Sequence, residues 1–397
     1  MSTGAGYEPG QSPQALKGVR VLELGSLIAG PYASALLAQF GAEVIKVEPP
    51  GRGDPLRKWR KLHAGTSLWW YVQSRNKKSI ALDLKTEAGR EAIRRLAAEV
   101  HIVVENFRPG TLEGWGLGWD VLKSINPKLV MLRVSGYGQS GPRRDLPGFA
   151  AIAECMGGLR YVTGAADRPP ARCGISLGDT LASLYGVFGV MVALHHVNTN
   201  AGSGQCVDLA LYEAVFATME SLVPEFAVQG FVRERSGASL PGIAPSNTYA
   251  CADGAHVAIA ANGDSLFRRL MSAIGREELG DDPQLADNEG RVRRAGELDA
   301  AIGAWTAMRT VAQVIQTLEA AAVPVGKIYT AADICADSHY AARGMIEQHV
   351  LPDGQAISVP GIVPKLTETP GRTRWLGPAL GEHNQEVLGA LGAGPLD

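Results

Sequence analysis

Residues Val19–Glu48 read VRVLELGSLIAGPYASALLAQFGAEVIKVE, and this stretch decides the fold. The run Val19–Leu24, rich in valine and leucine, predicts a strand, and Val44–Glu48 predicts a second one. Between them a glycine-containing turn leads into a predicted helix, Tyr32–Phe40, which ends at Gly41. Strand, turn, helix and strand within about 30 residues are typical of a right-handed βαβ unit, in which the two strands run parallel.

The alternation of strand and helix continues along the chain. Further strands are predicted at Ser79–Leu84, His101–Glu105 and Leu129–Val134, with a helix at Thr86–Glu99. This alternation predicts an α/β fold with an open, mostly parallel sheet. Two long apolar helices, Thr180–Val197 and Ala210–Gln229, are expected to follow, separated by the strand-like segment CVDLA.

The length of 397 residues suggests two or three domains. A loop rich in Gly, Pro and Ser at Arg233–Ser246 marks the predicted boundary. We therefore expect a flexible polar lead-in at 1–15, a large domain at 16–232, a small domain with its linker at 233–330, and a loop-rich C-terminal segment at 331–397. The elements predicted in the small domain are a strand at His256–Ala260 and helices at Asp264–Ile274, Ala295–Thr306 and Val311–Ala321.

Composition excludes several classes of protein. A formal charge of −2 gives no chain-wide reason to bind nucleic acid or an anionic membrane. No uninterrupted apolar run reaches the roughly 18 residues of a membrane span, and the longest, Leu181–Val197, carries His195 and His196. Five cysteines without a CxxC pair favour a reducing compartment over a disulfide framework. We expect a soluble cytoplasmic protein.

The first glycine turn is a poor match to a dinucleotide site. Gly25 and Gly30 are five apart, whereas the dinucleotide fingerprint is GxGxxG, and bulky Leu27 and Ile28 would block a pyrophosphate. NAD is therefore not expected. The eight histidines show no metal-ligand spacing, so no metal is expected either.

The segment GISLGDT at Gly174–Thr180 precedes a long apolar helix and allows two interpretations. Asp179 is either the N-cap of that helix or a nucleophilic carboxylate. In the second case the flanking glycines leave its oxygens open to substrate, and the helix dipole favours the ionised form.

Two further motifs follow predicted strands. Asn106 and Phe107 in ENFRPG, and Tyr137 in GYG, come just beyond the carboxyl ends of neighbouring strands, where open α/β sheets bind ligands. Asn106 is equally well placed to cap the turn before Pro109. A basic cluster, Arg52, Arg57, Lys58 and Arg60, is either a solvated loop or a site for an anion such as a phosphorylated ADP group.

The ordered motifs LIAGPYA, GAEVIKVEPPGRGDPLR, SRNKKSIALDL, VENFRPG, SGYGQSGP and LGDT, followed by NTYACADG, NEGRVRR, PVGKI, SVPG and LGEH, resemble those of class III CoA-transferases, the formyl-CoA/carnitine/succinyl-CoA family. The resemblance runs from about Leu16 to the last predicted helix. It implies a Rossmann-like large domain with an open, mostly parallel sheet, a smaller α+β domain and a C-terminal segment that returns to the large domain. It also implies a homodimer whose subunits interlock as rings.

The resemblance implies that Asp179 is the catalytic nucleophile, acylated by a donor acyl-CoA and then converted to an aspartyl-CoA thioester. Acyl-CoA and a small carboxylic acid are then the substrates, with no metal and no NAD. Residues at family CoA-contacting positions are Ala29, Leu82, Lys85, Asn106, Phe107 and Tyr137. Arg52, Arg57 or Arg108 would hold the CoA phosphates, because formyl-CoA enzymes carry other groups where Ile28, Pro49, Gly114 and Ser135 stand here.

The acyl side of the site is implied less directly. Gly178 and Phe149 are expected to shape it, and the motif wording most resembles the branch that uses succinyl-CoA and dicarboxylates. Arg172 and the arginines of Arg233–Arg235 are candidates for the distal carboxylate.

Two other functions are possible on the same sequence. α-Methylacyl-CoA racemases resemble this family but pair the aspartate with a histidine in a GHD segment, where this chain has Gly148-Phe149-Ala150. Phenylalanine cannot move a proton, so the second base of a racemase is missing. A non-catalytic acyl-CoA-binding protein is the third possibility.

Overall fold

A computed structural model of the chain describes residues 13–391. Residues 1–12, most of the predicted lead-in, lie outside the described residues. The chain forms two compact units. The first comprises the residues up to Leu159, Cys173–Glu220 and the residues from Gly344 onward, and the second comprises Arg160–Arg172 and Ser221–Arg343.

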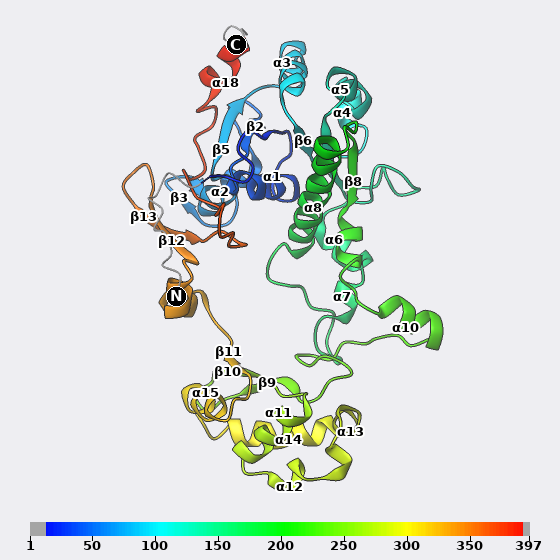
Figure 1. Cartoon of the computed structure of the whole chain (residues 1–397), viewed down its shortest axis with the longest axis vertical. Coiled ribbons are helices and arrows are strands. Elements are labelled where there is room, and N and C mark those ends of the chain that lie inside the picture. The colour runs from blue at the N-terminus through cyan, green and yellow to red at the C-terminus, as the bar shows by residue number, and fades with distance from the viewer. Residues whose placement is uncertain (1–12, 392–397) are drawn as a thin grey trace. The chain divides into compact units, whose positions relative to one another are not determined.

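A parallel sheet is the centre of the first unit (Figure 1). Its six strands lie in the order β5-β2-β1-β6-β7-β8, and all five pairings are parallel. The strands are β1 (Arg20–Glu23), β2 (Glu43–Glu48), β5 (Lys77–Ala81), β6 (Ile102–Glu105), β7 (Val130–Ser135) and β8 (Cys206–Ala210). The predicted open parallel α/β sheet is therefore confirmed.

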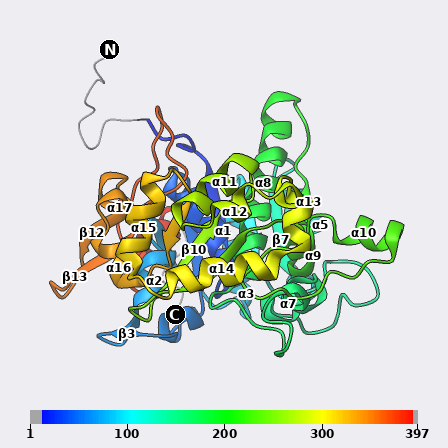
Figure 2. The same ribbon diagram turned by 90° about the horizontal axis from the view of Figure 1, so that it is seen from below.

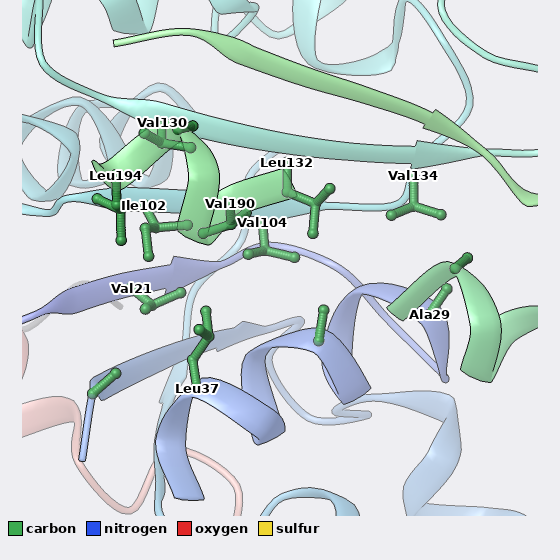
Figure 3. Close-up of a cluster of buried hydrophobic side chains, with 14 of the residues drawn as sticks. Val21, Ala29, Leu37, Ile102, Val104, Val130, Leu132, Val134, Val190 and Leu194 are labelled. Carbon is green, nitrogen blue, oxygen red and sulfur yellow. The ribbon is translucent and has the colours of Figure 1, made fainter. Parts of the chain in front are cut away.

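Helices cover both faces of this sheet, because successive residues of a strand point to opposite sides. Val21 packs in a cluster with side chains of α1 (Ala29–Gln39) and α8 (Leu177–Thr199). Its neighbour Leu22 packs in a second cluster with side chains of α3 (Glu87–Glu99), α5 (Trp119–Ile125) and α18 (Asn384–Ala390). Figure 3 shows the first cluster, with Val190 of α8 and Leu37 of α1 among the strand side chains.

Shorter elements complete the first unit. They are η1 (Pro55–Lys58), α2 (Leu68–Gln73), α4 (Thr111–Gly114), α6 (Ala150–Met156), α9 (Leu211–Phe216), the hairpin of β3 (Leu62–His63) and β4 (Thr66–Ser67), and the hairpin of β12 (Ile346–Val350) and β13 (Ala356–Pro360). The short helix α7 (Leu159–Val162) begins where the first unit passes into the second.

The second unit is an α+β structure around a three-stranded antiparallel sheet, in the order β11-β10-β9. Its buried core joins this sheet to α11, α14 and α15, which can be followed in Figure 2. The elements are α10 (Leu222–Gln229), β9 (Ser246–Ala250), β10 (His256–Ala260), α11 (Asp264–Ala273), α12 (Glu277–Gly280), η2 (Pro283–Leu285), α13 (Asn288–Arg293), α14 (Ala295–Thr306), α15 (Val311–Ala320), β11 (Val325–Lys327), α16 (Ala331–Ala336) and α17 (Ser338–Ala342). The strand and the three helices predicted here are present, within one residue of their expected ends.

The structure has two helices where the sequence predicted one. The stretch Ala210–Gln229 forms α9 and α10, with a break that contains Glu220 in the left-handed region at φ 49°. The sequence did carry a signal of this break, because Glu220 and Ser221 are polar and Pro224 lies in the first turn of α10.

The helix α8 is long and apolar enough to cross a membrane, judged by length and composition alone. Core helices of soluble proteins pass the same test. Here one stripe of α8, including Ala182, Gly186, Val190 and Leu194, is buried in the core of the first unit. Gly186 allows the closest approach, because a Cβ there would lie 2.9 Å from Leu132 of β7.

Candidate active site

The glycine turn after β1 is held on both sides by side chains. Leu27 has a left-handed backbone, with φ 65°. Its N–H donates to both carboxylate oxygens of Asp54, at 3.1 and 3.2 Å, and its carbonyl accepts from the side-chain amide of Gln73. A strained conformation of a bulky residue persists only where its surroundings fix it in this way. Asp54 and Gln73 therefore set the shape of the turn.

Asn106 holds the neighbouring residue of the same turn. Its Oδ1 accepts from the Ser26 N–H at 2.8 Å, and its Nδ2 donates to the Ser26 carbonyl at 2.9 Å. A Cβ at Gly25 would lie 2.5 Å from Asn106 Oδ1, so only glycine fits there. Both ends of the Asn106 amide are therefore used inside the protein, and the residue positions the turn.

A buried network of ion pairs supports the turn through Asp54. Lys46 Nζ lies 2.7 Å from Glu23 and 2.7 Å from Asp54, and Lys77 Nζ lies 2.7 Å from the other oxygen of Glu23. Each of these four side chains is at most 1% exposed. Burial raises the pKa of Asp54, but Lys46 and the N–H donors outweigh burial, so the pKa lies below its usual value. The Asp54 carboxylate stays ionised and holds both Lys46 and the turn.

A cavity of about 260 Å³ opens beside this turn, at the carboxyl ends of β1, β2 and β5. Gly25, Ser26 and Leu24 form one wall, and Phe107 and Trp115, in edge-to-face contact at 5.4 Å, form another. Among the predicted CoA residues, Leu82, Lys85 and Phe107 line the cavity. Its charged lining residues are the cations Arg52 and Lys85 and the acids Glu48, Asp54 and Asp83. Apolar lining with two cations suits an adenine ring and its phosphates.

Three other predicted CoA residues lie elsewhere in the first unit. The side-chain amide of Asn106 is hydrogen-bonded to the Ser26 backbone, as described above. Ala29 is buried in the core, and its carbonyl accepts from the Ser183 hydroxyl at 2.7 Å. Tyr137 lies beside Tyr212, with ring centres 6.5 Å apart, and is not among the lining residues of this cavity.

The arginines expected near phosphate differ in what they contact. Arg52 lines the cavity. Arg57 instead donates to both oxygens of Glu48, at 2.7 and 2.8 Å, and to the Pro378 carbonyl, with its guanidinium 3.7 Å from the centre of the Trp70 ring. Arg57 is therefore a structural residue. Arg108 is exposed and does not line the cavity.

Asp179 lies in the first turn of α8, not at its N-cap. The helix begins at Leu177 after the N-cap residue Ser176, so the N-cap interpretation of Asp179 is wrong. Its side chain is half-buried. The first turn of a helix favours a negative charge, because its backbone N–H groups point out of the helix end. The position therefore suits a reactive carboxylate.

Neighbouring contacts fix this turn. Gly178 is buried against α6, where its Cβ would lie 3.3 Å from Ala150. Its N–H points at the fully buried carboxylate of Glu154, at 3.4 Å. One turn further on, the Ser183 hydroxyl bonds to α1 as described, so α6 and α1 together position the start of α8.

A second cavity, of about 550 Å³, borders the start of α8. Ser176 and Thr180, on either side of Asp179 in sequence, form part of its wall. Arg60 and Lys61 line the same cavity, and the other lining residues are Ile28, Tyr32, Leu68, Trp69, Gln73 and Ile175. Ile28 belongs to the glycine turn, so this turn borders both cavities.

The remaining predicted substrate residues are placed as follows. Phe149 is the residue before α6 and is 68% exposed, with no acid or base chemistry of its own. Arg172 belongs to the second unit and is exposed. Arg233 forms an ion pair with Glu225 at 2.5 Å, and Arg235 donates to the Tyr161 carbonyl.

Sequence reasoning missed the residues that position the site. Gln73 and Glu154 lie outside the quoted motifs, and Lys46, Asp54 and Lys77 lie within motifs but were given no role. One signal was present: Lys46 and Lys77 interrupt predicted or observed strands of a sheet that is buried on both faces, and a buried charge needs a partner. Within residues 13–391, no group of three or more His, Cys, Asp or Glu is placed to hold a metal ion.

Comparisons with known proteins agree on one family. The model of CoA-transferase family III matches residues 16–384. Succinyl-CoA–D-citramalate CoA-transferase of Chloroflexus aurantiacus is 51% identical over 95% of this chain and 94% of its own. The beta subunit of succinyl-CoA–L-malate CoA-transferase from the same organism is 43% identical over 94% and 93%. Among solved structures, a CaiB/BaiF family protein from Brucella suis has a TM-score of 0.85 and 32% identity, over 96% of this chain and 100% of its own.

Proposed function

The chain belongs to CoA-transferase family III and is an enzyme of that family, and we propose that it moves CoA from succinyl-CoA to a small dicarboxylate of the citramalate and malate type. The identity of the relatives supports the donor and the class of acceptor. The observation that carries the proposal is the place of Asp179, in the first turn of α8 beside a cavity large enough for an acyl group.

The chemistry begins with acylation of Asp179. Its carboxylate oxygen attacks the thioester carbonyl of succinyl-CoA, which forms a mixed anhydride and releases CoA thiolate. The thiolate then attacks the aspartyl carbonyl, which gives an aspartyl-CoA thioester and free succinate. The thioester energy is conserved in both intermediates, so the reaction consumes no ATP.

The second half repeats these steps in reverse with the acceptor. A carboxylate of the acceptor attacks the aspartyl-CoA thioester, forming a new anhydride and CoA thiolate. The thiolate attacks the acceptor's acyl carbonyl, which releases the new acyl-CoA and restores the Asp179 carboxylate. Because water would hydrolyse either anhydride, the protein must keep the reacting carbonyl dry.

CoA binding is assigned to the cavity beside the glycine turn. Leu82 and Phe107 offer apolar contact to the adenine, and Lys85 and Arg52 offer positive charge to the phosphates. Asn106 and Asp54 hold the turn that separates this cavity from the one next to Asp179. The turn's shape then sets the path of the pantetheine arm.

A homodimer is part of the proposal. Five apolar side chains on one face of α8 are exposed in the single chain: Leu184, Tyr185, Phe188, Met191 and Val192. Their spacing follows the helical repeat, so they form one continuous stripe. An exposed apolar stripe of this kind marks an interface, and a second copy of the chain is the partner that the family resemblance implies. We also place the enzyme in the cytoplasm, a reducing compartment that suits its five free cysteines.

The test of the proposed function is a panel of donors and acceptors. Succinyl-CoA, acetyl-CoA and butyryl-CoA are each incubated with C4–C5 dicarboxylates and monocarboxylates, and the CoA products are identified by mass spectrometry. We expect succinyl-CoA with citramalate or malate to give the new acyl-CoA and an equal amount of succinate. Release of free CoA without a new acyl-CoA, or α-deuterium incorporation into a 2-methylacyl-CoA in D2O at turnover rates, would overturn the proposal.

A further inference from the structure

The cavity beside α8 carries two positive charges and no negative one. Of its ten lining residues, Arg60 and Lys61 are cations, and none is Asp or Glu. Both cations are exposed. The remaining walls are apolar or neutral, and the start of α8 adds the positive end of a helix dipole. The cavity is therefore built for a small anion with an apolar stem.

The two cations are free for a ligand, unlike their neighbours in the same loop. The Arg57 guanidinium donates hydrogen bonds to the Glu48 carboxylate, and the Lys58 ammonium donates to the Gly65 carbonyl at 2.8 Å. Among residues 13–391, neither the Arg60 guanidinium nor the Lys61 ammonium has a hydrogen bond or ion pair. Arg60 is instead steered by Trp69, whose ring centre lies 4.6 Å from the guanidinium carbon.

The backbone at this point is also unusual. Arg60 has φ 58°, in the left-handed region that residues with a side chain rarely adopt. Such a conformation needs support from its surroundings, which the stacking on Trp69 and the hydrogen bond from the Leu68 N–H to the Lys61 carbonyl supply. The loop thus fixes the backbone of two adjacent cations that line the cavity, and Trp69 orients the Arg60 side chain.

We propose that Arg60 and Lys61 bind the remote carboxylate of the acyl group, the one that does not react. This rests on the proposed function, in which the donor and acceptor acids occupy the same place in turn. Each acid has one carboxylate that joins Asp179 and a second one at the far end of a short apolar stem. Ser176 and Thr180, which flank the reacting Asp179 in sequence, line this cavity together with the cation pair.

The phosphates of CoA are the competing source of negative charge. Lys85 and Arg52 line the other cavity, at the carboxyl ends of the central strands, and offer positive charge to phosphate there. If Arg60 and Lys61 bound phosphate instead, every acyl-CoA would depend on them equally. If they bind the remote carboxylate, only the acyl-CoA esters of dicarboxylates would depend on them.

The test compares succinyl-CoA with butyryl-CoA, which has the same chain length but no second carboxylate. We expect the single variants Arg60→Gln and Lys61→Gln to lower kcat/KM for succinyl-CoA by about tenfold or more each, as the loss of a charge-assisted hydrogen bond predicts. The value for butyryl-CoA should change by less than about threefold. Arg60→Lys keeps a charge and should restore part of the activity with succinyl-CoA.

A second measurement does not depend on turnover of butyryl-CoA. Free succinate and free butyrate are each tested as inhibitors of the donor reaction, and the variants should weaken inhibition by succinate alone. The matched control is the double variant Arg95→Gln/Lys128→Gln, which removes two exposed charges elsewhere in the same unit and should leave both values unchanged.

The outcomes separate this inference from the function it rests on. If the wild-type enzyme transfers CoA from succinyl-CoA but the variants lose activity equally with both donors, or lose none, the remote-carboxylate site is overturned and the function stands. If the wild-type enzyme transfers CoA to no acid in the panel, the function itself fails.

Discussion

Asp54 connects the buried ions to the glycine turn, so a single atom change there has two effects. Asp54→Asn removes one of the two carboxylate partners of Lys46 and weakens the acceptor of the Leu27 N–H. Removing one partner of a buried ion pair costs about 3–5 kcal/mol. Because Lys46 keeps its ion pair with Glu23, the cost here belongs at the lower end of that range, about 3 kcal/mol. We expect urea unfolding at pH 7 to show a loss of that size, while Asp145→Asn, at an exposed site, changes stability by less than about 0.5 kcal/mol.

The same substitution predicts a pH dependence. The pKa of Asp54 is lowered on folding, so its ionisation stabilises the protein above the pKa of the unfolded chain, about 3.9. That contribution is lost as the pH falls through the lower pKa of the folded state. The stability difference between wild type and Asp54→Asn should therefore shrink below about pH 4. A difference that stays constant from pH 7 to pH 3 would show that folding does not lower the pKa of Asp54.

The cysteines give a second prediction for single residues. Burial raises the pKa of the Cys206 thiol to about 11, although Arg133 opposes the shift. At pH 8 only about one thiol in a thousand is then the reactive thiolate. Iodoacetamide should label exposed Cys155 and Cys335 long before Cys206, and all five should react in urea. Peptide mass spectrometry over time measures this, and labelling of Cys206 as fast as Cys335 would contradict it.

At the scale of elements, the sequence predicted strands and helices well where their patterns were long. The βαβ unit at Val19–Glu48 and the helices of the second unit came from periodicity alone. The prediction from sequence failed where a single residue decides the backbone geometry. Ala210–Gln229 was predicted as one helix, yet a left-handed residue at Glu220 divides it. Aspartate is a preferred N-cap residue, but α8 starts two residues before Asp179.

The contact between α1 and α8 offers a test at this scale. The Ser183 hydroxyl donates to the Ala29 carbonyl, and both groups are buried. Ser183→Ala leaves that carbonyl without its donor, so we expect a loss of about 1–2 kcal/mol in the free energy of unfolding. Because α8 carries Asp179, kcat should fall as well. The control is Ser124→Ala, which removes an exposed hydroxyl bonded only within its own turn. It should change neither the free energy of unfolding nor kcat.

Which side chains form the site was predicted in part, and the reason is physical. Leu82, Lys85 and Phe107 reach one cavity because they follow β5 and β6, whose carboxyl ends lie at the same edge of the parallel sheet. Sequence could not distinguish Arg57 from Arg52, because the two differ only in what lies beside them after folding. It also gave no reason to select Lys61.

At the scale of the whole molecule, the exposed face of α8 is the feature that a single chain leaves unexplained. Phe188 is 67% exposed at the middle of the stripe. If a second copy covers it, Phe188→Glu buries a charge in the interface and should convert a dimer into monomers. Light scattering after gel filtration measures the mass.

The control for this prediction is Val121→Glu, at an isolated apolar residue of α5 that is 39% exposed. It should leave the mass of the dimer unchanged. A wild-type protein that is monomeric at micromolar concentration would contradict the proposed homodimer, while leaving the chemistry at Asp179 to be tested separately.

That chemistry is tested most directly by the mass of the enzyme itself. Wild type and Asp179→Ala are mixed with succinyl-CoA without an acceptor, quenched in acid, digested, and analysed by mass spectrometry. We predict that the wild-type peptide containing residue 179 gains the mass of CoA less one water, that hydroxylamine removes it, and that the variant gains nothing and transfers no CoA. Full transfer activity in Asp179→Ala, or a covalent adduct on any other residue, would contradict the account.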